Sequence, residues 1–464
     1  MNHNRTRDQN ASRLKRFTIL PLLVLALLAN GCAGSGEAEL NVLLVTLDTT
    51  RRDHLGCYGG GTLTPNFDAL ARDGVRFDTA IATSGATPIS HASILTGLNP
   101  PGHGVRVIYA ESGFYLEETV PTLATILKDK SWRTGAFLSS FTVSSFFGFD
   151  RGFGTFDEGL QVPVDRSFAQ QDNGFWSWPL DLNQRRADGT TDEAIAWIRQ
   201  TDRPFFAWVH YWDPHDTKLM PPDEVMMPFV SREMDDDTLK RGIYKAEVFY
   251  MDSQFGRLIA SLKAAGLYDN TIVIVVADHG EGLGDHGWWH HRILYQEQIH
   301  VPLIMRVPGW PAGTIVGDLV RTTDIAPTIL ERLGLELPAD IDGLDMSGLV
   351  DGTADGTARV AYADAINIFD LNAGLVTSRP DDAMLYCAMD GEWKYIHRPL
   401  LEGKDELFHL KTDPREQKNL FTAEPEQVER LKSALDRFNG YVDKPFGTPT
   451  DEKVLERLKS LGYM

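Results

Sequence analysis

Asn41-Val-Leu-Leu-Val-Thr-Leu-Asp48 is an uninterrupted apolar and β-branched run that ends in a carboxylate. A second run of the same kind, Thr271-Ile-Val-Ile-Val-Val-Ala277, ends in Asp278 and His279. Continuous apolar runs of this length predict strands that are buried on both faces, as strands of parallel sheets are. The two runs therefore predict an α/β fold built on a largely parallel sheet.

Predicted strands and helices alternate over most of the chain. Further strands are expected at residues 133–138, 204–209 and 303–307, with helices between them. This alternation predicts a large, mostly parallel central sheet with helices on both faces. The predicted helices cover residues 66–73, 87–97, 122–130, 191–200, 244–265 and 323–334.

The pattern changes after about residue 355. Short predicted strands are separated there by turns, and a predicted helix follows them. Runs of short strands followed by a helix are typical of an α+β unit with an antiparallel sheet. We therefore predict a large α/β domain over residues 41–354 and a smaller C-terminal α+β subdomain over residues 355–464. The strands are expected at 358–362, 384–388 and 392–396, and the helix at 425–438.

Residues 1–32 have the pattern of an export signal. Basic residues precede an apolar run, Phe17–Leu28, and small residues ending in Cys32 follow it. A cysteine at this point resembles the cleavage site of bacterial lipoproteins, although Ala29 stands where leucine is usual. We expect Cys32 to carry lipid, residues 33–40 to form a tether, and the protein to face the periplasm or the exterior from the membrane. A cleaved periplasmic protein and an uncleaved membrane anchor are the alternatives.

Charge and cysteine content narrow the function classes. The formal net charge is −20, and an acidic surface argues against a nucleic acid partner, whose phosphates need Lys and Arg. An anionic substrate needs only local positive charge or a metal ion. Three cysteines are too few for a disulfide framework and form no zinc-binding pattern.

Polar residues follow three of the predicted strands at the point where each strand ends. They are Asp48, His210 and the pair Asp278–His279. In open α/β sheets, sites form outside the carboxyl ends of the strands. We therefore expect these side chains to gather in one site.

The stretch Ser84–Gly97 reads as a loop that runs into a short helix. Thr87 is predicted to be the N-cap, Pro88 the first helical residue and Gly97 the end of the helix. Unpaired N–H groups and the helix dipole attract anions to such a position. A hydroxyl there favours a nucleophile facing phosphate or sulfate, and a plain capped helix is the alternative.

Short motifs in a constant order extend over nearly all of the chain after the signal, and each of them alone is weak. In this order they resemble the sulfatase family of the alkaline phosphatase superfamily. The resemblance implies an alkaline-phosphatase-like sandwich and an enzyme that hydrolyses sulfate or phosphate esters. The motifs are Asn41–Asp48, Asp53–Gly59, Thr64–Asp68, Ser90–Gly97, His210–His215, Asp278–Glu281, Gly284–Gly287, Tyr295–Glu297, Val301–Ile304, Asp324–Thr328, Trp393–Ile396, Glu406–Phe408 and Thr412–Pro414.

The resemblance also implies roles for single residues. Asp48, Asp278 and His279 would bind one divalent metal ion together with Thr87, which also occupies the nucleophile position. Carboxylates with one imidazole suit Ca²⁺, Mg²⁺ or Mn²⁺, and Zn²⁺ less exclusively. The other candidates are histidines: His91, where sulfatases carry an arginine; His210 and His215, on the substrate side; and His290 or His291, near the place of the family's Lys or His that binds the transferred group.

The chain departs from the sulfatase pattern at the nucleophile and at two other positions. Sulfatases oxidise a Cys or Ser in the pattern Cys/Ser-x-Pro-x-Arg to formylglycine, whereas this chain has Thr87-Pro-Ile-Ser-His91. Threonine cannot become formylglycine by that route, so no formylglycine is expected. Thr49 replaces the second acid of the family's Asp-Asp pair, and Ser139-Ser-Phe141 stands where Lys-x-His is expected.

These departures favour a phosphoester or phosphonoester hydrolase with the sulfatase fold. A threonine nucleophile with Asp, Asp and His around one metal ion is a complete minimal set for phosphoester chemistry. Sulfate ester hydrolysis stays open, as do a transferase that moves a phospho-group onto an envelope glycan or lipid and an inactive binding lipoprotein. Expected substrates are esters of small molecules, glycans or lipid headgroups, and residues 159–181 and 220–237 are predicted to recognise the alcohol part.

Overall fold

The computed structural model describes residues 39–108, 110, 113–159, 184–200, 203–215, 219–354, 358–370 and 374–438. The predicted signal with Cys32, the tether up to residue 38 and most of residues 159–181 lie outside these ranges. Within them, no helix combines the length and the apolar character needed to span a bilayer.

An eight-stranded sheet forms the core, in the order β4-β3-β5-β1-β6-β7-β2-β8. β1 pairs in parallel with β5 and β6, and β7 is antiparallel to both of its neighbours. Every residue of β1, β5 and β6 is buried, which explains their continuous apolar sequences. The strands are β1 (Asn41–Leu47), β2 (Val75–Ile81), β3 (Arg133–Phe137), β4 (Thr155–Asp157), β5 (Phe205–Tyr211), β6 (Thr271–Ala277), β7 (His300–Arg306) and β8 (Thr314–Arg321).

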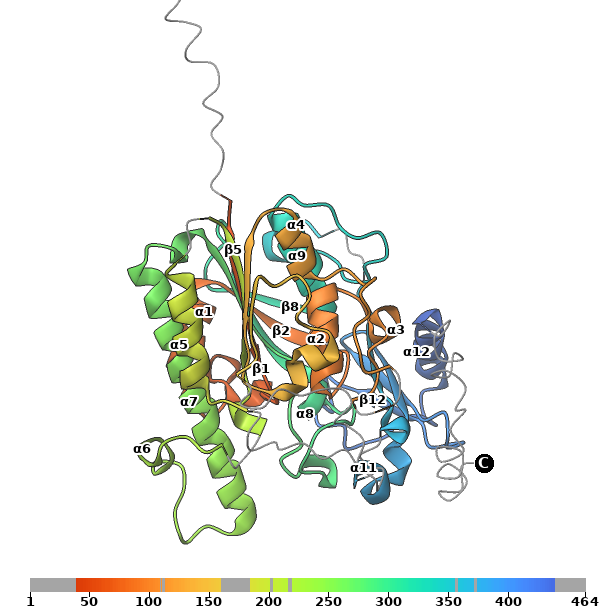
Figure 1. Cartoon of the computed structure of the whole chain (residues 1–464). Helices are drawn as coiled ribbons and strands as arrows, with labels where there is room; N and C mark the ends of the chain where they lie inside the picture. Colours follow the sequence, from red (N-terminus) through yellow and green to blue (C-terminus); the bar gives the residue numbers. More distant parts are fainter. Residues whose placement is uncertain are drawn as a thin grey trace, which may run out of the picture. The chain divides into compact units, whose positions relative to one another are not determined.

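Helices cover both faces of this sheet, as predicted (Figure 1). α1, α5 and α7 lie on one face, and α2, α4 and α9 lie on the other. The sandwich expected from the alternation of strands and helices is therefore confirmed. The helices are α1 (Pro65–Asp73), α2 (Thr87–Thr96), α3 (Pro100–His103), α4 (Leu123–Asp129), α5 (Ala187–Ile198), α6 (Asp223–Met226), α7 (Asp236–Ala264), α8 (Gln296–Ile299), α9 (Ile325–Arg332), α10 (Ser347–Asp351), α11 (Gly374–Ser378) and α12 (Pro425–Phe438).

A four-stranded antiparallel sheet follows, in the order β12-β11-β10-β9. One of its faces packs against Ile81 and the segment around Ile293–Tyr295, and the other face packs against Leu431 and Leu435 of α12. This confirms the predicted C-terminal antiparallel sheet with its helix. Its strands are β9 (Ala361–Ala365), β10 (Leu385–Met389), β11 (Trp393–His397) and β12 (Glu406–His409).

Several elements differ from the sequence-based expectation. β2, β4, β8 and β12 are not predicted, because they are short or mix polar with apolar residues instead of forming continuous apolar runs. β9 begins three residues later than expected, at Ala361. α7 begins at Asp236 rather than at 244, because Asp235 caps it by accepting the Thr238 N–H at 2.8 Å. Its first turns are polar and exposed, so they carry no apolar periodicity.

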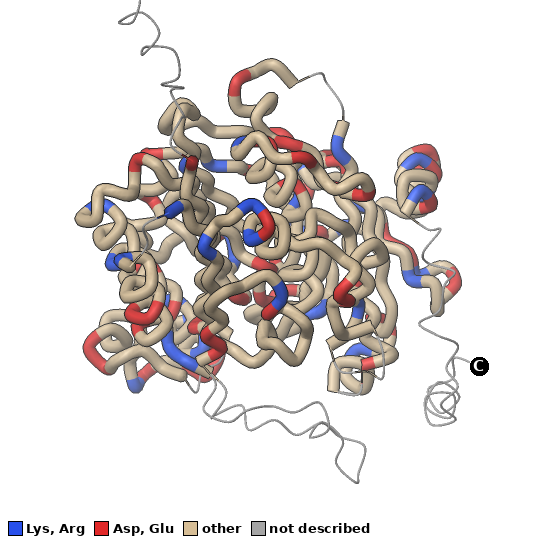
Figure 2. Tube along the Cα trace, turned by 45° about the horizontal axis from the view of Figure 1, so that its top comes forward, with Lys and Arg blue, Asp and Glu red and all other residues tan. Residues whose placement is uncertain are grey.

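A buried ion pair connects the second sheet to the segment before β7. The Nζ atom of Lys394 lies 2.7 Å from Oε1 of Glu416, and both side chains are fully buried. The second carboxylate oxygen of Glu416 accepts the Gln296 N–H at 2.6 Å. Acidic and basic residues otherwise intersperse along the described chain (Figure 2).

We expect Lys394→Met to lower the free energy of unfolding by about 3 kcal/mol, because it leaves the buried Glu416 carboxylate without its cation. Urea denaturation monitored by circular dichroism measures this change. The double variant Lys394→Met/Glu416→Gln removes both charges and is expected to recover most of the loss. Equal free energies of unfolding for Lys394→Met and the wild type would contradict a stabilising ion pair between Lys394 and Glu416.

Candidate active site

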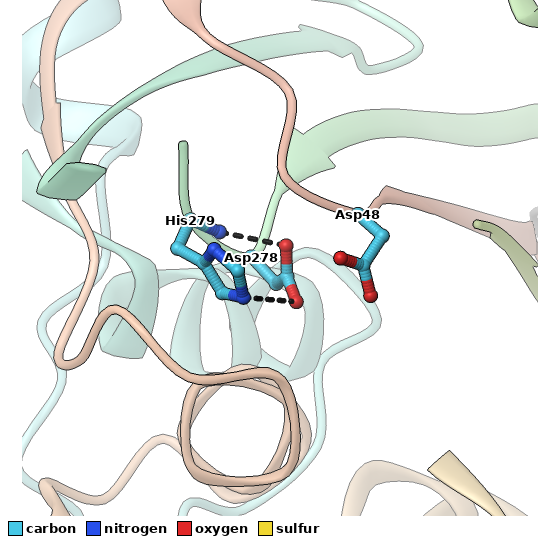
Figure 3. A group of neighbouring side chains, drawn as sticks. All are labelled: Asp48, Asp278 and His279. Carbon is cyan, nitrogen blue, oxygen red and sulfur yellow. Dashed lines mark hydrogen bonds and ion pairs between the residues drawn. The ribbon is translucent and has the colours of Figure 1, made fainter. Parts of the chain in front are cut away.

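The register of the central sheet brings the two candidate aspartates together. Leu47 of β1 pairs with Ala277 of β6, so Asp48 and Asp278 follow at the same level. Their backbones continue the ladder, because the Asp48 N–H donates to Tyr211 O at 2.8 Å and the Asp278 N–H to Leu47 O at 3.2 Å. Both carboxylates and the adjacent His279 are fully buried and lie side by side (Figure 3).

Three donor atoms in this group suit a divalent cation. Among the described residues, Oδ1 of Asp48 and Oδ2 of Asp278 are buried without a hydrogen-bond partner. Nδ1 of His279 lies 2.9 Å from Gly280 O, which can only accept, so Nδ1 carries the proton and Nε2 keeps its lone pair. One ligand atom from each residue falls within 4.8 Å of the others. This set of oxygens and one imidazole nitrogen fits the metal ion expected from the sequence.

The pKa values of the two carboxylates also indicate a site for a cation. Burial, and then the negative charge of Asp278, hold the pKa of Asp48 well above its usual range. Burial also raises the pKa of Asp278, although its Oδ1 accepts N–H groups from Thr49 at 3.2 Å and His279 at 2.7 Å. Two buried like charges are costly unless a cation compensates them. The raised pKa values therefore reflect two carboxylates for which the described residues supply no compensating cation, and a bound divalent ion would favour their charged forms.

Thr49 supports this group through its backbone. Its φ of 45° is in the left-handed region, which is costly for a β-branched residue. The Tyr244 hydroxyl donates to Thr49 O at 2.8 Å, and the Thr49 N–H donates to Asp278. Where the family carries a second acid, this chain thus uses a backbone N–H to orient Asp278.

Thr87 is not the N-cap of its helix, so that prediction is wrong. Ala86 is the N-cap, and Thr87 is the first residue of α2; Gly97 ends the helix in the left-handed region, as predicted. The Thr87 hydroxyl turns to the buried acids instead of capping: Oγ1 lies 3.3 Å from Asp48 Oδ2 and 3.2 Å from His279 Nε2. Competition from these partners explains the one-residue shift.

His91 and His210 lie beneath the nucleophile position and are fully buried. Nδ1 of His91 donates to Thr87 O at 2.8 Å and lies 3.5 Å from Asp278 Oδ2. Nε2 of His210 lies 3.3 Å from Asp48 Oδ2. Burial lowers the pKa of His91 to about 3 and that of His210 well below its usual range. Both histidines are therefore neutral. His91 orients Thr87 through its backbone carbonyl, and His210 orients Asp48 through its carboxylate.

A cavity of about 480 Å³ opens above Thr87. His215, His290 and His291 line it, so the structure gathers three of the predicted histidines at one opening. No described residue of segment 220–237 lines it. The complete lining is Thr87, Ile108, Thr142, Trp212, His215, Trp288, His290, His291, Arg292, Gly374, Leu375 and Ser378.

The histidines of the cavity lie close to Asp48, Asp278 and His279, which together are called the acid group below. The ring centroid of His291 is 4.7 Å from that of His279 and 5.0 Å from that of His215. Burial lowers the pKa of His215 and His291 well below the usual range, and in His215 the charge of His291 is the next cause. His215 stacks on Trp212 at a centroid distance of 3.7 Å. His215 and His291 thus face a ligand above Thr87 as neutral imidazoles.

Sequence reasoning missed several residues of this site. Trp212 and Arg292 line the cavity but are not among the residues predicted from the sequence, and Glu281 supports a predicted histidine, because its Oε2 lies 3.2 Å from His291 Nδ1. The signal for Arg292 is its position directly after His290 and His291. His286 lies apart from them and contacts Glu297 Oε1 at 2.9 Å, so it forms a separate cluster.

The segment at the place of the family's Lys-x-His has two polar residues, Ser139 and Ser140, whose hydroxyls bond to the fold. Ser139 Oγ lies 2.7 Å from His210 O and 2.6 Å from Thr190 Oγ1. Ser140 Oγ lies 3.1 Å from Thr142 Oγ1. Ser139 thus contacts β5 and Ser140 contacts its own loop, and neither residue brings positive charge to the site.

The sequence profile of the family described as Sulfatase matches residues 40–335. The chain belongs to the sulfatase family. It is therefore a sulfatase-like ester hydrolase, of the class that acts on sulfuric or phosphoric esters, and enzymes of this family bind a divalent metal ion. A second profile, N-sulphoglucosamine sulphohydrolase, C-terminal, matches residues 284–439 and covers the second sheet.

Individual relatives are distant but cover nearly the whole chain. An arylsulfatase of Clostridium perfringens is 24% identical over 478 residues, which cover 87% of this chain and 96% of that protein. The structure of BT4656 in complex with its substrate D-glucosamine-2-N,6-O-disulfate has a TM-score of 0.70 at 20% identity and covers 88% of this chain and 99% of its own. The phosphonate monoester hydrolase of Silicibacter pomeroyi has a TM-score of 0.69 at 21% identity and covers 89% and 97%. These structures confirm the alkaline-phosphatase-like sandwich.

Proposed function

We propose that the protein hydrolyses monoanionic phosphoesters, namely phosphodiesters or phosphonate monoesters, with Thr87 as the nucleophile. The observation that carries this proposal is the position of Thr87 Oγ1, 3.3 Å from Asp48 Oδ2 and 3.2 Å from His279 Nε2 on the floor of the cavity. A hydroxyl that touches the acid group and faces a cavity can attack a bound ester. The likeness to a phosphonate monoester hydrolase structure supports the fold for this chemistry.

The balance of charge favours a substrate group with one negative charge. Asp48 and Asp278 would cancel the charge of a divalent cation, and the one Lys or Arg among the described lining residues is Arg292, which pairs with Asp370 at 2.7 Å. The family's additional cations are replaced by the neutral His91 and by serines. A dianionic phosphate monoester would therefore carry an excess of negative charge into this site.

A bound divalent cation, held by Asp48, Asp278 and His279, would lower the pKa of the Thr87 hydroxyl and polarise a nonbridging oxygen of the ester. In the first step, Thr87 Oγ1 forms a bond to phosphorus and its proton passes toward Asp48 Oδ2. The bond from phosphorus to the alcohol oxygen breaks, and that oxygen takes a proton from a histidine of the cavity. The products of this step are the free alcohol and a threonyl ester at Thr87.

In the second step, water attacks the phosphorus of the threonyl ester. It gives one proton to the histidine that protonated the alcohol, and Thr87 Oγ1 leaves and regains its proton. Threonine has no geminal hydroxyl, so the ester can be cleared only by this second attack at the central atom. His91 fixes the backbone of Thr87 for both steps, because its Nδ1–H donates to Thr87 O.

We assign the alcohol-side proton to His215, which lines the cavity and stacks on Trp212. An anion in the cavity would raise its pKa toward the range that general acid catalysis needs. We expect His215→Ala to reduce kcat by about 10³-fold for esters with poor leaving groups such as alkyl alcohols, and much less for nitrophenyl esters. The dependence of kcat on leaving-group pKa in both proteins measures this. Equal losses for all leaving groups would contradict the assignment.

Hydrolysis of a panel of nitrophenyl esters tests the proposed function. The panel holds a phosphodiester, a phosphonate monoester, a phosphate monoester and a sulfate, each with Mn²⁺, Mg²⁺ or Ca²⁺ and with a chelator. The proposal predicts that the phosphodiester or the phosphonate monoester has the highest kcat/KM and that the chelator abolishes turnover. Highest kcat/KM for the sulfate would overturn the phosphoester preference, and metal-loaded protein with no turnover on any ester would favour a binding role.

A further inference from the structure

Arg292 occupies a special place in the cavity above Thr87. It is the one Lys or Arg among the described residues that line the cavity, and none of the described lining residues is Asp or Glu. The whole chain, in contrast, has 65 acidic and 45 basic residues. Arg292 is therefore the one described Lys or Arg that an anionic ligand in this cavity can meet.

The backbone of Arg292 is held in a costly conformation beside the nucleophile loop. Its φ of 78° is in the left-handed region, which a non-glycine residue adopts only when its surroundings enforce it. The Arg292 N–H donates to Gly85 O at 2.9 Å, two residues before Thr87. The Asn367 side chain donates to Arg292 O at 2.9 Å from the other side. The loop before α2 and the segment after β9 thus both hold the backbone of this one residue.

The guanidinium is oriented by one buried acid. Nη1 of Arg292 donates to Oδ2 of Asp370 at 2.7 Å, and the side chain of Asp370 is 3% exposed while that of Arg292 is 15% exposed. A guanidinium has five N–H donors in a planar fork, so this contact leaves donors for a ligand. Asp370 therefore orients the Arg292 guanidinium while using one of its N–H donors.

The positive charge of Arg292 lies close to the nucleophile along the chain and in space. Arg292 directly follows His291, whose ring centroid lies 4.7 Å from that of His279, and Nε2 of His279 lies 3.2 Å from Thr87 Oγ1. Arg292 and Thr87 also line the same cavity. A ligand in this cavity therefore meets the charge of Arg292 and the hydroxyl of Thr87 together.

We propose that Arg292 binds the nonbridging oxygens of the tetrahedral group that Thr87 attacks, and so supplies the cation that His91 and Ser139–Ser140 do not. The arginine fork matches the spacing of two oxygens on phosphorus or sulfur and binds them with charge-assisted hydrogen bonds. This assignment deepens the proposed function and rests on it for the identity of the transferred group. The ligand class is a tetrahedral oxyanion, of which inorganic phosphate is the simplest member.

Binding of inorganic phosphate to the Mn²⁺-loaded full chain, at a pH below the second pKa of phosphate so that the ligand is mostly the monoanion, tests this inference without relying on turnover. We expect Arg292→Gln to weaken phosphate affinity about 30-fold and Arg292→Lys about 10-fold, since lysine keeps the charge but loses the fork. Calorimetry measures both affinities, and Mn²⁺ affinity is expected to change less than threefold. Arg76→Gln is the matched control, because Arg76 also pairs with an aspartate, Asp78, at 2.8 Å but does not line the cavity.

Rescue by a small cation separates ligand binding from a structural role. In Arg292→Ala, added guanidinium chloride is expected to restore phosphate binding at least several-fold more than sodium chloride at equal ionic strength. Weak phosphate binding in Arg292→Gln without ester turnover by the wild type would support Arg292 and reject the proposed reaction. Unchanged phosphate affinity in Arg292→Gln and Arg292→Lys, with intact wild-type turnover, would overturn the inference and leave the reaction standing.

Discussion

Replacing Thr87 with alanine is expected to lower kcat for the best ester of the panel by about 10⁴-fold, because Thr87 is the one described cavity-lining residue whose hydroxyl contacts Asp48 and His279. Thr87→Ser keeps a hydroxyl at the same atom and is expected to retain measurable activity. The Thr87 hydroxyl contacts Asp48 and His279, which are themselves residues of the site. The fold should therefore tolerate both substitutions. Steady-state kinetics of the metal-loaded proteins gives the comparison.

Thr96→Ala is the matched control for this experiment. Thr96 lies in the last turn of the same helix, and its Oγ1 donates to Ala92 O at 2.7 Å, away from the acid group. Thr96→Ala removes a buried threonine hydroxyl from α2 that has no contact with the acid group, so kcat should stay close to that of the wild type. If Thr87→Ala retained wild-type kcat, a direct attack by water would replace the threonyl ester in the mechanism.

Replacing Asp48 with asparagine is expected to change activity and stability in opposite directions. We expect kcat/KM to fall by about 10³-fold, since the variant loses a ligand of the metal ion and the partner of Thr87 Oγ1. In a chelator, the variant should be more stable than the wild type by about 1–3 kcal/mol, because one of two adjacent buried negative charges is gone. Added Mn²⁺ should stabilise the wild type by about 2.7 kcal/mol at a hundred times its Kd, and the variant far less.

Thermal denaturation with and without Mn²⁺ measures both stability effects. Asp269→Asn is the control for the loss of one negative charge, because the Asp269 side chain is 98% exposed. It should leave the metal-dependent shift of Tm unchanged. A metal-free Asp48→Asn protein that is less stable than the wild type would contradict the view that the acid group stores uncompensated charge.

The parts of the fold that the sequence predicts are those where burial is complete. β1, β5 and β6 are buried at every residue, so their sequences are continuous apolar runs that end in the site residues. β8 shows the opposite case: it lies at the edge of the sheet, half of its residues are not buried, and its sequence mixes polar and apolar residues. Edge strands depend on pairing with a neighbour, which a single segment does not encode.

The candidate site divides in the same way. Asp48, Asp278 and His279 could be predicted, because each directly follows a buried strand and parallel strands end at one edge. Arg292 and Trp212 belong to irregular segments, and only the folded chain shows that they line the cavity of Thr87. The Thr87 hydroxyl contacts Asp48 and His279 instead of capping its helix, and this too could not be predicted from the local sequence. These partners are 39 and 192 residues away along the chain.

The most direct test of the threonine mechanism is to trap the threonyl ester. Metal-loaded protein is mixed with a nitrophenyl phosphonate, quenched in acid within the first turnover, digested and analysed by mass spectrometry. We predict that the peptide containing Thr87 carries the phosphonyl group on Thr87, and that chelated protein and Thr87→Ala show no such adduct. Rapid turnover with the peptide unmodified at every quench time, or with the group on another residue, would contradict the account.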